Sequence, residues 1–174
     1  MPPRDSVAMD SKVRERRVRL RKHIDAPPAI GPAEAGDARA LALELAGLQS
    51  ERPIDPMSLG VVLEPGEVLW RASMSWLRVR IDGLWSEASW SQVLITERRL
   101  LVRLASNDLV SLWWGSMVGF EVDLHAGHVV LDFGDGRTRL LSGPAVAVVA
   151  VAGVAQLYGI PALVTHPSLA PLRA

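Results

Sequence analysis

Hydrophobic and polar residues alternate with the two-residue period of β-strands through the middle of the chain. Two apolar runs, Val93–Ile95 and Leu100–Leu104, flank the polar residues 96–99, and this spacing predicts an antiparallel hairpin. The Thr96 hydroxyl can accept a hydrogen bond from the backbone two residues further on, which favours a turn there. We expect the other strands to be arranged around this central hairpin.

Strand-like runs recur on both sides of the hairpin. In residues 68–81 the apolar positions change from even to odd numbers after Trp76, which predicts a bulge or a sharp bend, because side chains alternate along a strand. Turn signals such as Asp135-Gly136 separate the later runs. The seven predicted strands cover residues 68–81, 93–95, 100–104, 109–114, 118–124, 129–133 and 138–140, with a loop over 82–89. Short strands with tight turns are typical of an antiparallel sandwich or barrel.

The N-terminal third is predicted to be helical and irregular. Residues 10–24 fit a helix with a narrow apolar stripe, too thin to hold the helix to a core. Residues 25–36 are rich in proline and glycine and are predicted to form a linker. Asp37 then caps a short amphipathic helix that reaches about Gln49.

The C-terminal part is predicted to close the domain with a helix that has Pro144 in its first turn and ends before Gly159. This helix is apolar nearly all round, so we expect it to be covered on both sides. The strands would cover one side, and the other needs the 37–49 helix, the tail or a second subunit. The chain thus divides into arm (1–24), linker (25–36), helix and connector (37–62), domain (63–160) and tail (161–174). We expect a folded unit of about 60–165 that does not need residues 1–36.

Two short motifs carry a resemblance to a known family. An L-x-P-G-E sequence opens the domain at Leu63–Glu67, and a T-x-x-R-L sequence occupies Thr96–Leu100. Together with seven strands followed by one helix, they resemble PH-like domains of the GRAM and bacterial PH kind over about residues 63–159. The resemblance implies an α+β, mostly β fold: a PH-like seven-stranded antiparallel split barrel closed by a C-terminal helix, here with an N-terminal helical extension.

The resemblance also implies where an anion would bind. In eukaryotic PH domains, anionic lipid headgroups bind basic residues around the loop after the first strand. Arg78 and Arg80 lie at the matching place and are candidate anion contacts. Asp82 and Glu87 occupy the loop itself and would repel a phosphate.

The net charge of zero conceals an uneven distribution. The first 24 residues hold eight Lys/Arg against three Asp/Glu, so a basic arm precedes an acidic body. Such an arm can bind a polyanion, either nucleic acid or an anionic membrane, or it can fold back on its own domain. Both alternatives stay open. The candidate polyanion-binding residues are Arg14, Arg16, Arg17, Arg19, Arg21 and Lys22.

Six tryptophans are the unusual feature of the composition. Trp113 and Trp114 are adjacent, so in a strand one faces inward and the other outward, and Trp85 lies in the 82–89 loop. Aromatic side chains carry much of the binding energy of protein interfaces, which makes these three candidate interface residues. The alternative is that the N-terminal segment or the closing helix covers them. The others, Trp70, Trp76 and Trp90, are expected in the core or at its rim.

No catalytic set of residues is evident. The chain has no cysteine and no G-x-S-x-G motif. His125 and His128 flank a turn but lack further metal ligands nearby, so exposed turn histidines are expected. Thr96 and Arg99 are expected to be structural, with Arg99 bonded to a carboxylate or a carbonyl. The sequence therefore predicts a protein that is not an enzyme, with no cofactor, metal or small-molecule substrate.

One uncharged segment raises the question of a membrane span. Residues 144–164 are long enough to cross a bilayer, but they include Gln156, Gly159 and Pro161 and lack flanking Lys/Arg anchors. A buried helix is the expectation. The N-terminus has no signal-peptide pattern, so we expect a cytoplasmic protein, or one peripheral to a membrane.

These observations favour a non-catalytic PH-like interaction or scaffold module that acts through protein contacts and can self-associate. The protein partner is not identified by the sequence. The alternative is a peripheral binder of nucleic acid or anionic membrane that uses residues 10–24. Added salt would separate the two hypotheses, because it weakens phosphate contacts steeply and apolar interfaces little.

Overall fold

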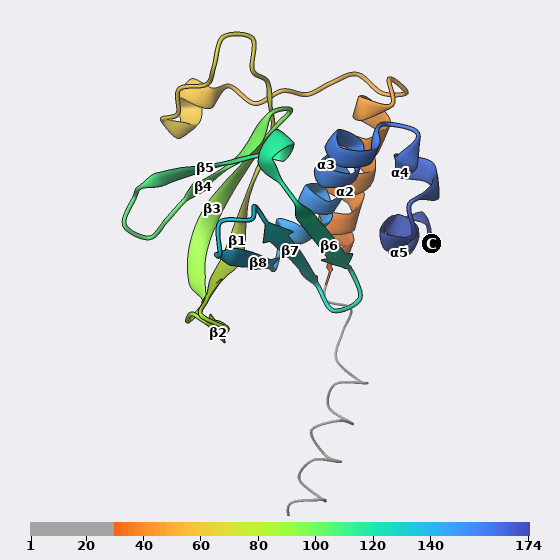
Figure 1. Cartoon of the computed structure of the whole chain (residues 1–174). Helices are drawn as coiled ribbons and strands as arrows, with labels where there is room; N and C mark the ends of the chain where they lie inside the picture. Colours follow the sequence, from red (N-terminus) through yellow and green to blue (C-terminus); the bar gives the residue numbers. More distant parts are fainter. Residues whose placement is uncertain (1–29) are drawn as a thin grey trace, which may run out of the picture.

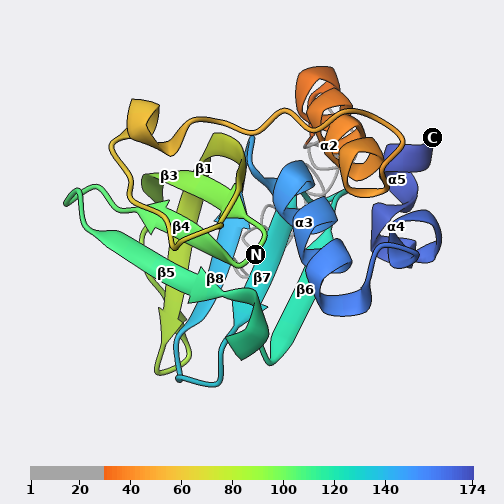
Figure 2. The same cartoon turned by 90° about the horizontal axis from the view of Figure 1, so that it is seen from above.

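The computed structural model describes residues 30–174, and its framework is an antiparallel sheet with helices packed against it (Figure 1, Figure 2). The strands are β1 (Leu69–Ile81), β2 (Leu84–Trp85), β3 (Ser89–Thr96), β4 (Arg99–Arg103), β5 (Leu109–Trp113), β6 (Gly119–Asp123), β7 (His128–Asp132) and β8 (Thr138–Ser142). The helices are α2 (Pro32–Leu45), α3 (Val146–Tyr158), α4 (Ala162–Thr165) and α5 (Ala170–Arg173), with 3-10 turns η1 (Pro56–Leu59), η2 (Trp114–Ser116) and η3 (Pro167–Leu169). The predicted class, α+β and mostly β, is confirmed.

β1 is the strand that both halves of the sheet share. Hydrogen bonds join the strands in the order β5-β4-β3-β1-β8-β7-β6, and β2 pairs with the end of β1. Residues 69–77 of β1 pair with β3, and residues 76–80 pair with β8. β5 and β6 are the two edges of this path and do not pair with each other. Within the described residues the strands themselves therefore do not close into a barrel, and η2 carries the chain from β5 to β6 without a ladder between them.

All seven predicted strands are present, and β2 is an eighth within the expected 82–89 loop. Asp82 and Gly83 both have positive φ, at 51° and 79°, and so form a tight two-residue turn. Leu84 and Trp85 consequently run back along β1, opposite Ile81 and Arg80.

The bulge in β1 lies elsewhere than the sequence pattern indicated. The register to β3 shifts between Leu69 and Arg71, whereas the pattern predicted a change after Trp76. Beyond the bulge, Leu77 is 8% exposed in the core, while Trp76 is 45% exposed on the opposite face. From Trp76 onward, the even-numbered residues of β1 therefore point away from the core, because neighbours on a strand face opposite sides.

α3 is buried along most of its length, and it is covered on both sides as predicted. One side packs on the sheet, where the Phe120 ring occupies the space that a Cβ on Gly153 would need. On the other side lie α2, which contributes the fully buried Leu41, and the C-terminal segment, which contributes Leu172. Figure 2 shows α3 between the strands and these outer helices.

α2 begins at Pro32, five residues before the predicted cap Asp37. Proline suits the first position of a helix, because the N–H that it lacks would have no partner there. The Gly31-Pro32 pair therefore starts a helix where the sequence analysis expected it to prevent one. Because Ala38 and Leu41 are fully buried, α2 belongs to the folded body, which extends beyond the expected 60–165.

The expected C-terminal tail is also folded. Residues 162–173 form α4, η3 and α5, and Leu163, Leu169 and Leu172 of this segment join the main core. The predicted 10–24 helix with its basic residues lies outside the described residues, as does the 25–29 part of the expected linker.

Candidate binding surface

The outer face of the sheet, on the side away from α3, carries a row of four residues that crosses four strands. Arg78 lies opposite Leu140, Leu140 opposite Val130, and Val130 opposite Glu121. Apart from Arg139, the residues that alternate with them along each strand are buried in the core or packed against it. The four side chains therefore point outward, and the row runs from an arginine across two aliphatic residues to a glutamate.

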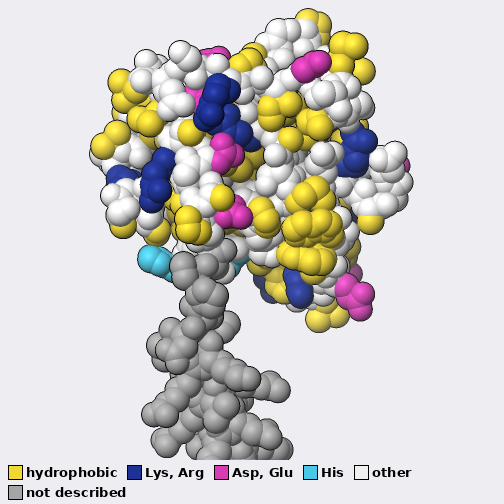
Figure 3. All heavy atoms as spheres, turned by 180° about the vertical axis from the view of Figure 1, so that it is seen from behind, with side chains coloured by type: hydrophobic (Ala, Val, Ile, Leu, Met, Phe, Trp, Pro, Cys, Tyr) yellow, Lys and Arg dark blue, Asp and Glu magenta, His cyan; other side chains and the backbone are white. Residues whose placement is uncertain are grey.

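An exposed pair of tryptophans lies next to this row. Trp76 of β1 lies opposite Trp90 of β3, and their ring centroids are 4.8 Å apart at an interplanar angle of 54°. The two residues are 45% and 42% exposed. Gly143 lies against both rings, since a Cβ there would be 3.7 Å from Trp76 and 3.9 Å from Trp90. In the view from behind, hydrophobic side chains are gathered towards the end of the molecule that holds β2 (Figure 3).

Charges of opposite sign lie on the two sides of this surface. Arg78 and Arg80 are exposed on β1, whereas Glu121 and Asp123 are exposed on β6. The backbone N–H of Ala126 donates a hydrogen bond to the Asp123 carboxylate at 2.8 Å and lowers its pKa, so this group stays ionised. We use the name outer sheet face for Trp76, Arg78, Arg80, Trp90, Glu121, Asp123, Val130 and Leu140.

The three tryptophans proposed from sequence are not brought together. Trp114 is 3% exposed, and its indole N–H donates to the Thr96 carbonyl at 3.0 Å. Trp113 is 37% exposed and lies opposite Arg99, whose guanidinium is 4.5 Å from its ring centroid. Trp85 is paired with Arg80 at the other end of β1. The adjacent exposed pair is Trp76–Trp90, which the sequence analysis had assigned to the core or rim.

Arg99 and Thr96 belong to a buried ion-pair network under the central hairpin. Arg99 Nε and Nη2 donate to the two carboxylate oxygens of Glu67, at 2.9 and 2.8 Å. Thr96 donates to Glu67 at 2.7 Å and accepts the Arg98 N–H at 3.1 Å, the bond expected from sequence. Burial alone would raise the pKa of Glu67, but the hydrogen bonds from Arg99 and Thr96 outweigh it and lower the pKa. This fully paired set suits a structural role.

A second buried network, missed from the sequence, joins α2 to β1. Arg71 donates to Glu44 at 3.0 and 3.1 Å and to Asp37 at 2.7 Å, and Arg52 donates to Glu44 at 3.0 Å. Burial would raise the pKa of Glu44, but the bonds from Arg71 and Arg52 hold it below its usual value. The bulge in β1 next to Arg71 interrupts the alternation of inward and outward side chains along the strand. No sequence motif marked the position of this bulge.

A polar cavity of about 400 Å³ lies beside Arg80, one of the two candidate anion contacts. Asp82 and Asp132 also line it, together with residues of the glycine-rich turn between β7 and β8, whereas Arg78 does not. Two carboxylates and one guanidinium give this cavity a charge balance that disfavours a phosphate.

The two histidines considered for a metal lie at the turn between β6 and β7. His125 lies in the turn after β6 and His128 begins β7 opposite Asp123. Within residues 30–174 no group of three or more His, Cys, Asp or Glu side chains is placed to hold a metal ion. The helices of that same range include none with the length and apolar character needed to cross a bilayer.

Comparisons with known proteins leave the family open. No protein-family model matches the sequence, and no curated protein matches it. Among solved structures, the C-terminal domain of an unknown protein from Leishmania infantum is similar, with a TM-score of 0.41 and 14% sequence identity. That match covers 54% of this chain and 87% of the other. A likeness at this level names neither a family nor an activity.

Proposed function

We propose that the chain is a non-catalytic, PH-like interaction module whose outer sheet face binds a second copy of the chain. The exposed Trp76–Trp90 pair is the observation that carries this proposal. Exposed tryptophans are enriched at the energetic centres of protein interfaces, because each can bury a large apolar area with little loss of side-chain freedom.

The charge pattern of the outer sheet face favours a second copy as the partner. A two-fold axis between Leu140 and Val130 would place Arg78 of one protomer against Glu121 of the other, and the reverse contact would form at the same time. The aliphatic pair would lie at the centre of such a dimer, and each Trp76–Trp90 pair would lie to the side, against the partner's edge strand β6. The sequence has no net charge and a pI near 6.9, so long-range repulsion between copies would be small.

The exposed aromatic area sets the expected strength of this dimer. A fully buried tryptophan removes roughly 250 Å² from water, so the exposed parts of Trp76 and Trp90 amount to roughly 200 Å² in each protomer and roughly 400 Å² in a dimer. At about 25 cal/mol per Å², burying all of this area contributes about 10 kcal/mol. Association costs about 4–15 kcal/mol in lost freedom, so the tryptophans alone cannot hold a tight dimer. With the charged pairs added, we expect a dissociation constant on the order of 100 µM.

The proposal can be tested by reversing the charge of Arg78 or Glu121 singly and then exchanging both charges in one variant. Sedimentation velocity over a wide range of concentrations should show a reversible dimer for the full-length chain. Arg78→Glu and Glu121→Arg should each abolish it, because each substitution creates two like-charge contacts across the two-fold axis. The double variant should restore the dimer, and Arg137→Glu, outside the outer sheet face, should leave it unchanged.

Two results would contradict the proposal. One is a monomer at every accessible concentration, and the other is a double variant that dimerises no better than the single ones. Trp76→Ser provides a second line of evidence, because it removes apolar area without changing charge. It should weaken the dimer without lowering the melting temperature, since the side chain is nearly half exposed.

The second candidate function rests on charge in the sequence alone. The concentration of arginine within residues 10–24 favours bidentate contacts with phosphates, which lysine does not make. Electrophoretic-shift and liposome co-sedimentation assays would compare the full-length chain with a variant carrying Arg14, Arg16, Arg17 and Arg19 changed to Ser. Binding that falls steeply with salt and is lost in the variant would favour this function. Equal behaviour of the two proteins at low salt would exclude it.

A further inference from the structure

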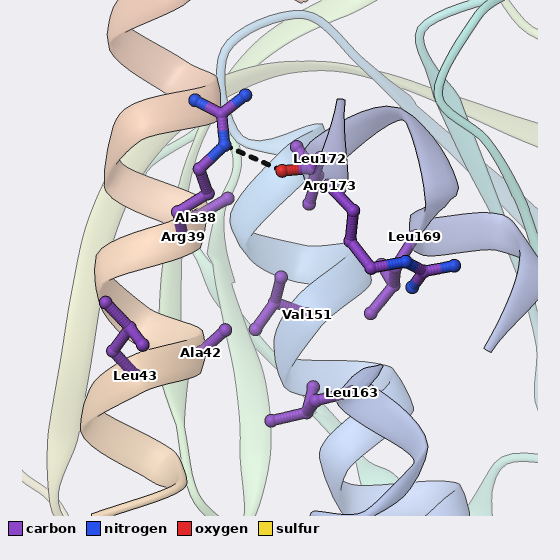
Figure 4. Close-up of a pocket in the computed structure, with 9 residues that line it drawn as sticks. All are labelled: Ala38, Arg39, Ala42, Leu43, Val151, Leu163, Leu169, Leu172 and Arg173. Carbon is purple, nitrogen blue, oxygen red and sulfur yellow. Dashed lines mark hydrogen bonds between the residues drawn. The ribbon is translucent and has the colours of Figure 1, made fainter. Parts of the chain in front are cut away.

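An apolar cavity of about 260 Å³ lies between α2, α3 and the C-terminal helices (Figure 4). The side chains of Ala38, Ala42 and Leu43 come from α2, and Val151 comes from α3. Leu163, Leu169 and Leu172 complete the apolar wall from the C-terminal segment. The cavity lies on the opposite side of α3 from the sheet, so it is separate from the outer sheet face.

Small side chains keep this space open. Ala38 and Ala42 are four residues apart and therefore lie on the same face of α2, towards Val151. A larger aliphatic residue at Ala42 would fill part of the space that the two alanines leave. An apolar cavity of about 150 Å³ can hold a benzene molecule, so this one has room for roughly eight to ten carbon atoms.

Two arginines give the rim of the cavity a positive charge. Arg39 Nε donates to the Leu172 carbonyl at 2.7 Å, which fixes the side chain beside the cavity (Figure 4). Arg173 lies on the other side and donates to the His166 carbonyl at 3.2 and 3.3 Å. Within residues 30–174, neither arginine forms a salt bridge with a side-chain carboxylate. Arg39 Nη2 also donates to the Ala174 oxygen at 3.4 Å, so among the described residues both guanidinium groups are bonded to backbone oxygens and to no side-chain carboxylate.

We propose that this cavity binds a small anionic amphiphile, a single medium-length alkyl chain that carries a carboxylate. The alkyl chain would occupy the space lined by alanine, valine and leucine, where its burial is favourable. The carboxylate would remain at the rim and accept hydrogen bonds from Arg39, whose Nη1 has no hydrogen bond to a described residue. This inference is independent of the proposed dimer, because the two surfaces share no residue.

The N-terminal segment of the same chain is the main competing occupant. Its residues 1–24 carry eight Lys/Arg against three Asp/Glu, so it would bring positive charge to a rim that is already positive. Charge complementarity therefore favours an external anion over this segment.

Calorimetric titration of the full-length chain with decanoate tests the inference, with decanol and decyltrimethylammonium as matched probes. Decanoate, kept below its micelle concentration, should bind at one saturable site, and the other two probes at least about tenfold more weakly, because the decanol hydroxyl is a neutral acceptor and the trimethylammonium group is a cation without an acceptor. Arg39→Gln should weaken decanoate binding by about tenfold, whereas Arg137→Gln, far from the cavity, should not change it.

Filling the cavity provides a second, independent readout. Ala42→Leu should abolish saturable decanoate binding without lowering the melting temperature, and Ala33→Leu on the same helix outside the cavity should preserve binding. Equal affinities for decanoate and decanol would overturn the proposed chemistry. Unchanged decanoate binding in Ala42→Leu would overturn the location. If a chain that lacks residues 1–29 binds decanoate much more tightly than the full-length chain, the N-terminal segment is the occupant instead.

Discussion

Arg99→Ala should strongly destabilise the fold, because it leaves a buried carboxylate without its partner. The Glu67 side chain is 0% exposed and Arg99 is 10% exposed, and two hydrogen bonds shorter than 3.0 Å join them. Removing one member of such a buried pair typically costs about 3–5 kcal/mol. For a domain of this size, each kcal/mol lowers the melting temperature by roughly 2–5 °C, so we expect a decrease of about 10–15 °C.

The same variant should reverse the pH dependence that Glu67 gives to folding. In the wild-type protein the pKa of Glu67 is lowered from 4.5, so its stabilising contribution is present above about pH 4.5 and is lost as the pH falls through the folded-state value. Without Arg99, burial raises the pKa, and the folded variant takes up a proton above pH 4.5. The stability difference between the two proteins should therefore be larger at pH 7 than at pH 4.

Urea unfolding followed by tryptophan fluorescence at these two pH values would measure both effects. Glu67→Leu/Arg99→Met is the matched control, since replacing both charges with apolar groups should cost less than removing one. A loss below about 1 kcal/mol for Arg99→Ala, or an equal loss at both pH values, would refute the reasoning. Lost dimerisation with unchanged stability would show that Arg99 is an interface residue.

Other contacts lead to further predictions. Gly153→Ala should cost about 1–3 kcal/mol in chemical denaturation, because the Phe120 ring fills the space that the new methyl group needs. Glu44→Gln should cost about 2–4 kcal/mol, because Arg71 keeps its buried charge but loses its main partner, and a calorimetric melt that matches wild type would contradict this. Removal of residues 1–29 should leave the melting temperature unchanged, whereas removal of residues 1–45 should abolish the cooperative transition, because α2 covers α3.

The alternation of apolar and polar residues was sufficient to predict most of the sheet. Strand order was implied by the turns where a two-residue signal such as Asp135-Gly136 joined two runs. The same kind of signal at Asp82-Gly83 was interpreted as a loop, although it forms the β1–β2 turn. Extending that hairpin in the same register would have placed Trp76 opposite Ser89, because the register shifts by one residue between β2 and β3 and so brings Trp90 opposite Trp76.

The missed features depend on contacts between distant parts of the chain. Arg71 reaches Asp37 and Glu44 only because of a bulge in β1, and a bulge moves a side chain without leaving a clear mark in the sequence. The cavity beside Ala42 requires α2 and the C-terminal helices to pack on the same side of α3. The sequence offered three possible covers for α3, and its pattern could not choose between them.

The division of β1 between two partners has a consequence for folding during synthesis. When residues up to the end of β5 have emerged from the ribosome, residues 69–77 can already pair with β3, but β8 does not yet exist. The edge of residues 76–80 that pairs with β8 in the complete fold then stays open until residues 138–142 appear. At about 5–20 residues per second this interval lasts roughly 1.5–6 s. An unpaired edge with exposed apolar side chains is prone to pair with other chains, so β1 is where a nascent chain would need protection by a chaperone.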